Sequence, residues 1–203
     1  MSTHSSIAIF NPSIEIIIRE IEEVFIVGRK RTKDFSNEFE FFFEVNLESE
    51  YVVSDDYLGG TVMIVHHEHN PNWVQIDYDL GNVYVLDEML RNITLKLNTI
   101  AFIGFNQTTS GDFRFALFEN GKLLRSIYQK YLDFHNQMRL MDNYGKKLSF
   151  EKIDFGTPFT RELPKEHQLN FETLNDWQGK LGFVYHERSN LEYIHLEILK
   201  FRN

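Results

Sequence analysis

The residues most suggestive of chemistry are His66-His67-Glu68-His69. Alternate side chains of a strand lie on one face, so His67 and His69 are suitably spaced to bind one metal ion. Asp77 or Asp79, across an expected hairpin, is the candidate third ligand. The group is not an HExxH zinc motif, and it falls where a strand is expected to give way to a turn. Exposed turn histidines are the simpler interpretation, and a metal-assisted hydrolase is the alternative.

Two pairs of carboxylates also have residue types that do chemistry. Asp55-Asp56 and Asp77-x-Asp79 have the composition for acid and base roles in hydrolysis. Aspartate is equally favoured in turns, where its side chain bonds to nearby backbone amides, and both pairs lie in or beside expected turns. The sequence has no glycine-flanked serine elbow, GxGxxG pattern, P-loop or cysteine. We therefore predict no catalytic residue and no cofactor.

Length and charge narrow the class of protein. The chain has 203 residues, a formal net charge of −9 and 19 phenylalanines. This length allows one sizeable core, and we expect a single α+β domain over residues 1–203. The acidic charge opposes attraction to phosphate, so nucleic acid is not an expected partner. The sequence shows neither an apolar run long enough for a membrane span nor signal-peptide features, which predicts a cytoplasmic protein with no membrane partner.

The clearest structural signal runs from Thr99 to Tyr128. Both central positions of a type I′ turn have positive φ, and Asn120-Gly121 has the residue types that this turn prefers. The stretch therefore predicts a β-meander with an Asn-Gly hairpin at the centre of a mostly antiparallel sheet. Its three strand-like segments are 100–105, 113–118 and 123–128.

Charged residues lie within and beside the strand-like segments of this meander. Asp112 and Arg114 stand near the start of its second segment, and Arg125 is the one charge in its third. Alternation places Arg125 on the face opposite its two neighbours. We interpret the meander as scaffold rather than as the functional surface.

Two to four helices are expected to pack on this sheet. Apolar spacing predicts helices from Pro12 to Phe25 with Asn11 as N-cap, from Leu86 to Leu97, and from Phe171 to Leu181 with Asn170 as N-cap. The β-branched residues of the first segment leave a strand as its alternative. Residues 127–141 also have helical spacing, whereas 146–165 is irregular and 29–31 is expected to be a solvated loop. The remaining predicted strands are Ile7–Phe10, Phe39–Val45, Thr61–His67, Trp73–Tyr78, Phe183–His186 and Leu191–Phe201.

Acidic and aromatic residues suggest a surface for binding another protein. Phenylalanine and glutamate alternate along Phe39–Val45, and Trp and Tyr are enriched among binding hot spots. Tyr78 is a further candidate for an exposed aromatic. The predicted partner-binding residues are Glu38, Glu40, Phe42, Glu44, Asp55, Asp56, Tyr57 and Trp73.

The segment FRFALFENGKLLRSIY, with its Asn-Gly hairpin and following Leu-Leu-Arg, resembles small acidic cytosolic bacterial proteins of the polymorphic-toxin immunity type. The resemblance covers residues 87–128. It implies a non-enzymatic module that neutralises a cognate, basic toxin by covering its surface. Complementary charge would speed encounter and aromatic residues would supply affinity. An oligomeric scaffold is a third class, and the oligomeric state is left open.

Overall fold

The structure is a computed structural model. It describes residues 3–10, 13–33, 60–66, 70–79, 84, 86–132, 137–159, 162–185 and 193–201, and it describes the side chains of most of these. The predicted strand Phe39–Val45 lies outside the described residues.

The described strands form one sheet with the order β2-β9-β3-β4-β1-β5-β6-β7-β8, in which all neighbours are antiparallel. The α+β class with an antiparallel sheet is thus confirmed. The strands are β1 (Thr3–Phe10), β2 (Phe25–Lys33), β3 (Gly60–His66), β4 (Trp73–Asp79), β5 (Ile100–Gln107), β6 (Asp112–Glu119), β7 (Lys122–Leu132), β8 (Gln137–Gly145) and β9 (Tyr193–Phe201). The helices are α1 (Ile14–Val24), α2 (Asp87–Leu97), α3 (Phe171–Lys180) and the short 3-10 helix η2 (Lys165–His167).

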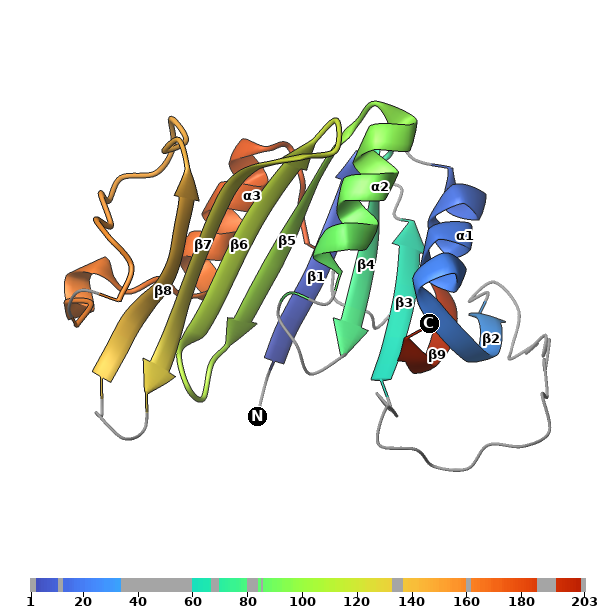
Figure 1. Cartoon of the computed structure of the whole chain (residues 1–203), viewed down its shortest axis with the longest axis horizontal. Coiled ribbons are helices and arrows are strands. Elements are labelled where there is room, and N and C mark those ends of the chain that lie inside the picture. Colours follow the sequence, from blue (N-terminus) through green and yellow to red (C-terminus); the bar gives the residue numbers. More distant parts are fainter. Residues whose placement is uncertain are drawn as a thin grey trace.

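Two hydrophobic cores lie on opposite faces of this sheet. Helices α1 and α2 lie in front of it and α3 lies behind (Figure 1). The front core joins both front helices to strands β1, β3, β4, β5 and β6 and to the first residue of β2, with Phe25 and Phe118 among its fully buried side chains. The rear core contains Phe102, Phe115 and Trp177 and extends under residues 148–155 and 163–185. Strand alternation thus supplies an apolar layer to each face.

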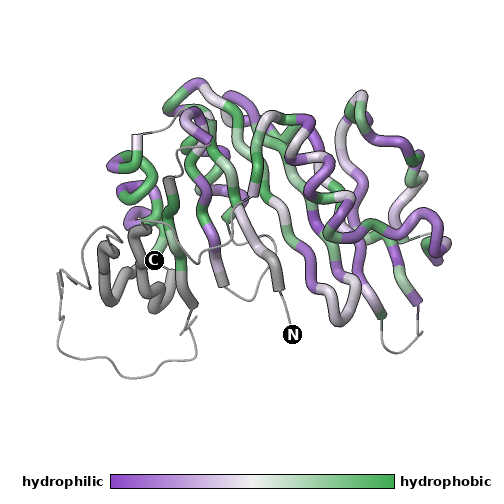
Figure 2. Tube along the Cα trace, turned by 180° about the vertical axis from the view of Figure 1, so that it is seen from behind, coloured by the Kyte–Doolittle hydropathy of each residue, from purple (hydrophilic) through white to green (hydrophobic). Residues whose placement is uncertain are grey.

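Helix α1 forms because its isoleucines recur with helical spacing. Ile17, Ile18 and Ile21 are buried against the sheet, whereas Arg19 and Glu22 are exposed. Figure 2 shows this division, with hydrophobic turns of α1 toward the strands. The helix begins at Ile14 with Ser13 as N-cap, so the prediction of Asn11 as N-cap was wrong.

Helix α2 connects the front core to the meander. It ends at Leu97, and its C-cap Asn98 has a left-handed φ of 49°. The buried hydroxyl of Thr94 accepts a hydrogen bond from the backbone N–H of Gly121, at 3.1 Å. This bond fixes α2 on the turn between β6 and β7, where Asn120 and Gly121 both have positive φ, 49° and 78°.

Helix α3 packs directly on a glycine of β5. Asn170 caps it as predicted, accepting a hydrogen bond from the backbone N–H of Thr173 at 2.9 Å. A Cβ atom added at Gly104 would lie 2.7 Å from Nε2 of Gln178 and 2.9 Å from Cδ1 of Leu174. The absence of a side chain at Gly104 therefore allows this close contact between helix and strand.

Three local predictions were wrong, and distant strand pairing explains the first two. The helical spacing of 127–141 belongs to β7 and β8, which pair Gln129 with Leu140 and Lys130 with Arg139. The expected loop at 29–31 is part of β2, which pairs with β9 near the other end of the chain. Residues 183–185 form no strand. Backbone pairing to segments far away in sequence leaves little local signal.

Candidate functional site

One of the fully buried charged side chains among the described residues lies on the meander. Arg114 projects from β6 toward the front face, and its side chain is 0% exposed. Its Nη2 donates to both carboxylate oxygens of Asp87, at 2.8 Å and 2.6 Å. Asp87 is the first residue of α2, where a negative charge is also favoured by the helix dipole. The ion pair thus joins the start of α2 to β6, which is third from the β8 edge among the described strands, so the prediction that the meander forms the centre of the sheet was wrong.

The aromatic ring of Tyr84 covers the solvent-facing side of this ion pair. The guanidinium carbon of Arg114 lies 4.2 Å from the ring centroid of Tyr84, a cation–π contact. The Tyr84 ring meets Tyr128 of β7 edge to face, with centroids 5.7 Å apart. Tyr84 is nevertheless 42% exposed. It therefore presents to solvent an aromatic ring whose position is fixed by neighbours on two strands.

Burial raises the pKa of the nearby phenols. It raises the pKa of Tyr128 to about 12, and the carboxylate of Asp112 acts in the same direction. It also raises the pKa of Tyr84 and of Tyr78 above the ordinary value, against the lowering influence of Arg114. The Tyr78 hydroxyl is buried and has no hydrogen-bond partner within the described part of the chain. At neutral pH the hydroxyls of these tyrosines are protonated, so they can donate a hydrogen bond but cannot act as bases.

Three aspartates surround the tyrosine pair. Asp142 of β8 lies directly opposite Tyr128, and it accepts a hydrogen bond from the hydroxyl of Ser126. Asp112 accepts from the backbone N–H of Tyr131 at 2.8 Å, which fixes the carboxylate beside β7. We call this surface the tyrosine–carboxylate patch. Its members are Tyr84, Asp87, Asp112, Tyr128, Asp142 and Tyr144.

The patch lies on an open part of the sheet. Figure 1 shows α2 in front of the middle strands and no helix in front of β8. Tyr144, opposite Ser126 on the same face, is 55% exposed. Lys130 and Arg139 lie opposite each other further along β7 and β8, beyond Asp142. These two cations mark where the acidic surface ends. The patch has three negative carboxylates, and beneath them lies the single positive guanidinium of Arg114. This surface is therefore locally acidic.

A second buried ion pair lies on the rear face. Arg125 donates to both oxygens of Glu151, each at 2.8 Å, and to the side-chain oxygen of Asn143 at 2.7 Å. Its face is opposite that of Ser126, as alternation predicted. The Glu151 carboxylate also accepts from the backbone N–H of Leu148 at 3.1 Å. This network attaches the irregular segment after β8 to the sheet, which is a structural role.

Most of the predicted site residues lie outside the described residues. These are Glu38, Glu40, Phe42, Glu44, Asp55, Asp56, Tyr57, His67 and His69. Their partner-binding and metal-binding roles stay predictions. Among the described residues, no group of three or more His, Cys, Asp or Glu side chains has an arrangement that could hold a metal ion.

The remaining predicted residues are buried. Trp73 is 5% exposed and packs edge to face on Phe10 and Phe183, so the expectation that it forms part of an exposed surface was wrong. Tyr78, also expected to be exposed, is 4% exposed. Asp77 is fully buried and accepts a hydrogen bond from Gln75 at 3.1 Å. The alternation of residues along a strand does not show whether a face of the sheet is exposed or buried. In this protein helices or loops cover both faces at these positions.

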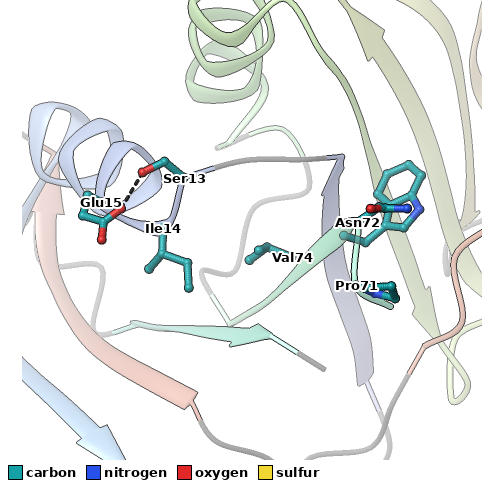
Figure 3. A pocket seen from close by; sticks show the side chains of 7 residues that line it. Ser13, Ile14, Glu15, Pro71, Asn72 and Val74 are labelled. Atoms are coloured by element: carbon teal, nitrogen blue, oxygen red, sulfur yellow. Dashed lines mark hydrogen bonds between the residues drawn. The ribbon is translucent and has the colours of Figure 1, made fainter. Parts of the chain in front are cut away.

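A cavity of about 320 Å³ lies between the start of α1 and the turn before β4. Figure 3 shows the side chain of Val74 pointing toward Ile14 across it. The hydroxyl of Ser13 donates to the carboxylate of Glu15 at 2.5 Å, and this bond lowers the Glu15 pKa. The two polar side chains on the α1 side of this cavity therefore bond to each other, and the residues that line it include no histidine, cysteine or lysine.

The tyrosine–carboxylate patch was present in the sequence only as isolated charges. Asp112 and Arg114 were visible as charges in an apolar strand, but Asp87 and Tyr84, the partners of Arg114, come from a preceding helix and loop. Comparison with protein families, curated proteins and solved structures finds no match. None of the described helices has the length and apolar character needed to span a membrane.

Proposed function

We propose that the protein is a non-enzymatic module that binds a basic protein through the tyrosine–carboxylate patch. The observation that carries this proposal is the exposed Tyr84 ring, held in place over Arg114 and beside Tyr128. A rigid aromatic side chain loses little conformational entropy on binding, which is why Tyr is enriched among interface hot spots.

The surrounding charges define the class of partner. Asp87, Asp112 and Asp142 lie around the tyrosines, and the whole chain has a net charge of −9. Negative potential speeds encounter with a positively charged surface and disfavours acidic competitors. The patch therefore suits a partner whose surface is rich in lysine and arginine.

The finer form of this proposal is neutralisation of a bacterial toxin. An acidic immunity protein would occlude a basic toxin stoichiometrically, and its own chemistry would not be required. The acidic residues Glu38, Glu40, Glu44, Asp55 and Asp56 remain candidates for a second part of the same interface.

The test is a pull-down from the native host, followed by titration of the retained protein with purified variants. We expect a basic protein to be retained, and Tyr84→Ala to weaken its binding by at least about 30-fold, the size of an interface hot spot. Asp142→Asn should mainly slow association and reduce its dependence on salt. Val184→Ala is the matched control, because Val184 is 58% exposed and belongs to the segment after α3.

The results distinguish a wrong assignment of the interface from a wrong assignment of the partner. Equal binding by wild type, Tyr84→Ala and Asp142→Asn would exclude the patch as the interface. Retention of no basic protein would overturn the proposed partner class. Circular dichroism of each variant establishes that a loss of binding is not a loss of fold.

A further inference from the structure

A separate pocket lies behind the sheet, on the face opposite the tyrosine–carboxylate patch. It has a volume of about 200 Å³ and lies between α3 and the segment that contains Phe150 and Ile153. An apolar cavity of about 150 Å³ holds a benzene molecule. The pocket therefore has room for a group the size of an amino-acid side chain.

The floor of the pocket is a fixed aromatic surface. Trp177 is 4% exposed, and its ring meets Phe113, Phe115 and Phe150 with centroids 5.9, 5.3 and 6.0 Å away. Leu169, 3% exposed, adds an aliphatic wall. Because these rings hold the indole on several sides, little ordering is needed when an apolar group enters.

Two opposite charges line the same pocket. Lys152 comes from the irregular segment and Asp176 from α3. No ion pair within 4.0 Å joins them, and neither side chain has another hydrogen-bond or ion-pair partner among the described residues. An ammonium and a carboxylate are thus both available above an apolar floor.

We propose that this pocket binds a free α-amino acid with an apolar side chain. The side chain contacts Trp177, Phe150 and Leu169, the ligand's ammonium group pairs with Asp176, and its carboxylate pairs with Lys152. Ligand sites are mostly apolar with a few polar groups that fix orientation, and this pocket has that composition. A zwitterion satisfies both charges at once, whereas an anion or a cation satisfies only one.

Isothermal titration calorimetry of the full chain with L-leucine and L-phenylalanine tests the proposal. We expect saturable binding, and about a 10-fold or greater loss in either Asp176→Asn or Lys152→Gln, as for hydrogen bonds to charged groups. Both side chains are exposed, so neither substitution should affect folding. The matched controls are Glu172→Gln and Lys180→Gln, exposed charges of α3 that do not line the pocket.

Truncated ligands identify which charge meets which group. The compound 4-methylpentanoate lacks the ammonium group of leucine, so its binding should be insensitive to Asp176→Asn and sensitive to Lys152→Gln. Isopentylamine lacks the carboxylate and should show the reverse pattern. No saturable binding of either amino acid at about 10 mM, ten times a 1 mM dissociation constant, would overturn the proposal. Equal affinity of the two variants and wild type for L-leucine would also overturn it.

Discussion

At the scale of single residues, Arg114 decides how the front face is organised. A guanidinium at 0% exposure is costly to bury unless its charge is compensated, and Asp87 and Tyr84 compensate it here. Because these two partners come from α2 and the loop before it, the charge on β6 also positions Tyr84. The exposed tyrosine of the proposed interface therefore depends on a buried arginine.

Replacing this arginine should be strongly destabilising. Arg114→Ala leaves Asp87 without its partner beside the core, and we expect a loss of about 3–5 kcal/mol in the free energy of unfolding. Urea denaturation followed by circular dichroism measures this loss. Lys130→Ala is the control, because Lys130 is an exposed cation on the neighbouring strand and should change stability by less than about 0.5 kcal/mol. Similar values for the two variants would contradict the structural role of Arg114.

The raised phenol pKa of Tyr128 predicts loss of stability in alkaline solution. The folded pKa is about 12 and the ordinary value is 10.0. Between these values the unfolded chain releases the proton and the folded chain retains it, so stability falls as pH rises above about 10. Below that pH both states are protonated and Tyr128 contributes no pH dependence. Urea midpoints for wild type and Tyr128→Phe, compared from pH 9 to 11, should show a shallower decline in the variant; identical slopes would contradict this account.

At the scale of elements, α3 depends on the glycine beneath it. Gly104→Ala should displace α3 and reduce stability by about 1–3 kcal/mol, as overpacking of a core does. Urea unfolding followed by tryptophan fluorescence reports both effects, because Trp177 lies on α3.

A second glycine provides the opposite control. An added Cβ at Gly179, inside α3, meets nothing within 4 Å. Gly179→Ala should therefore raise stability by about 0.5–1 kcal/mol through helix propensity. A destabilisation by both substitutions would indicate that helix docking is not the cause at Gly104.

At the scale of the whole molecule, the two ends of the chain meet in one sheet. Strand β9 lies between β2 and β3, so residues 193–201 pair with residues 25–33 and 60–65. Such distant pairing makes folding slow, because loop closure must precede the contacts that stabilise it. It also makes the sheet continuous only when the last strand is present.

Removing the last strand should therefore affect the whole sheet. A chain that ends at residue 192 lacks β9, so β2 loses its pairing partner and β3 becomes an edge. We expect a lower urea midpoint and aggregation, measured by denaturation and by light scattering. A chain that ends at Phe201 retains β9 and is the control. A cooperative transition with an unchanged midpoint in the shorter chain would contradict the pairing of β9.

The sequence by itself determined those elements whose signal is local. The alternation of β5 and β6, the Asn120-Gly121 turn, the spacing of α2 and the Asn170 cap each depend on neighbouring residues, whose conformational preferences act without the rest of the fold. Arg125 could likewise be assigned to a face, because side chains alternate along any strand.

Only the tertiary structure decided which of these elements meet. Strands β2 and β8 are held by backbone pairing that carries no side-chain signature, and the burial of Trp73 depends on what covers its face of the sheet. The tyrosine–carboxylate patch has the same origin. Asp87, Arg114, Tyr128 and Asp142 lie far apart in the chain, and the antiparallel register with the docking of α2 brings them together. Spacing in the sequence records neither the register nor the docking, because both depend on which surfaces bury each other.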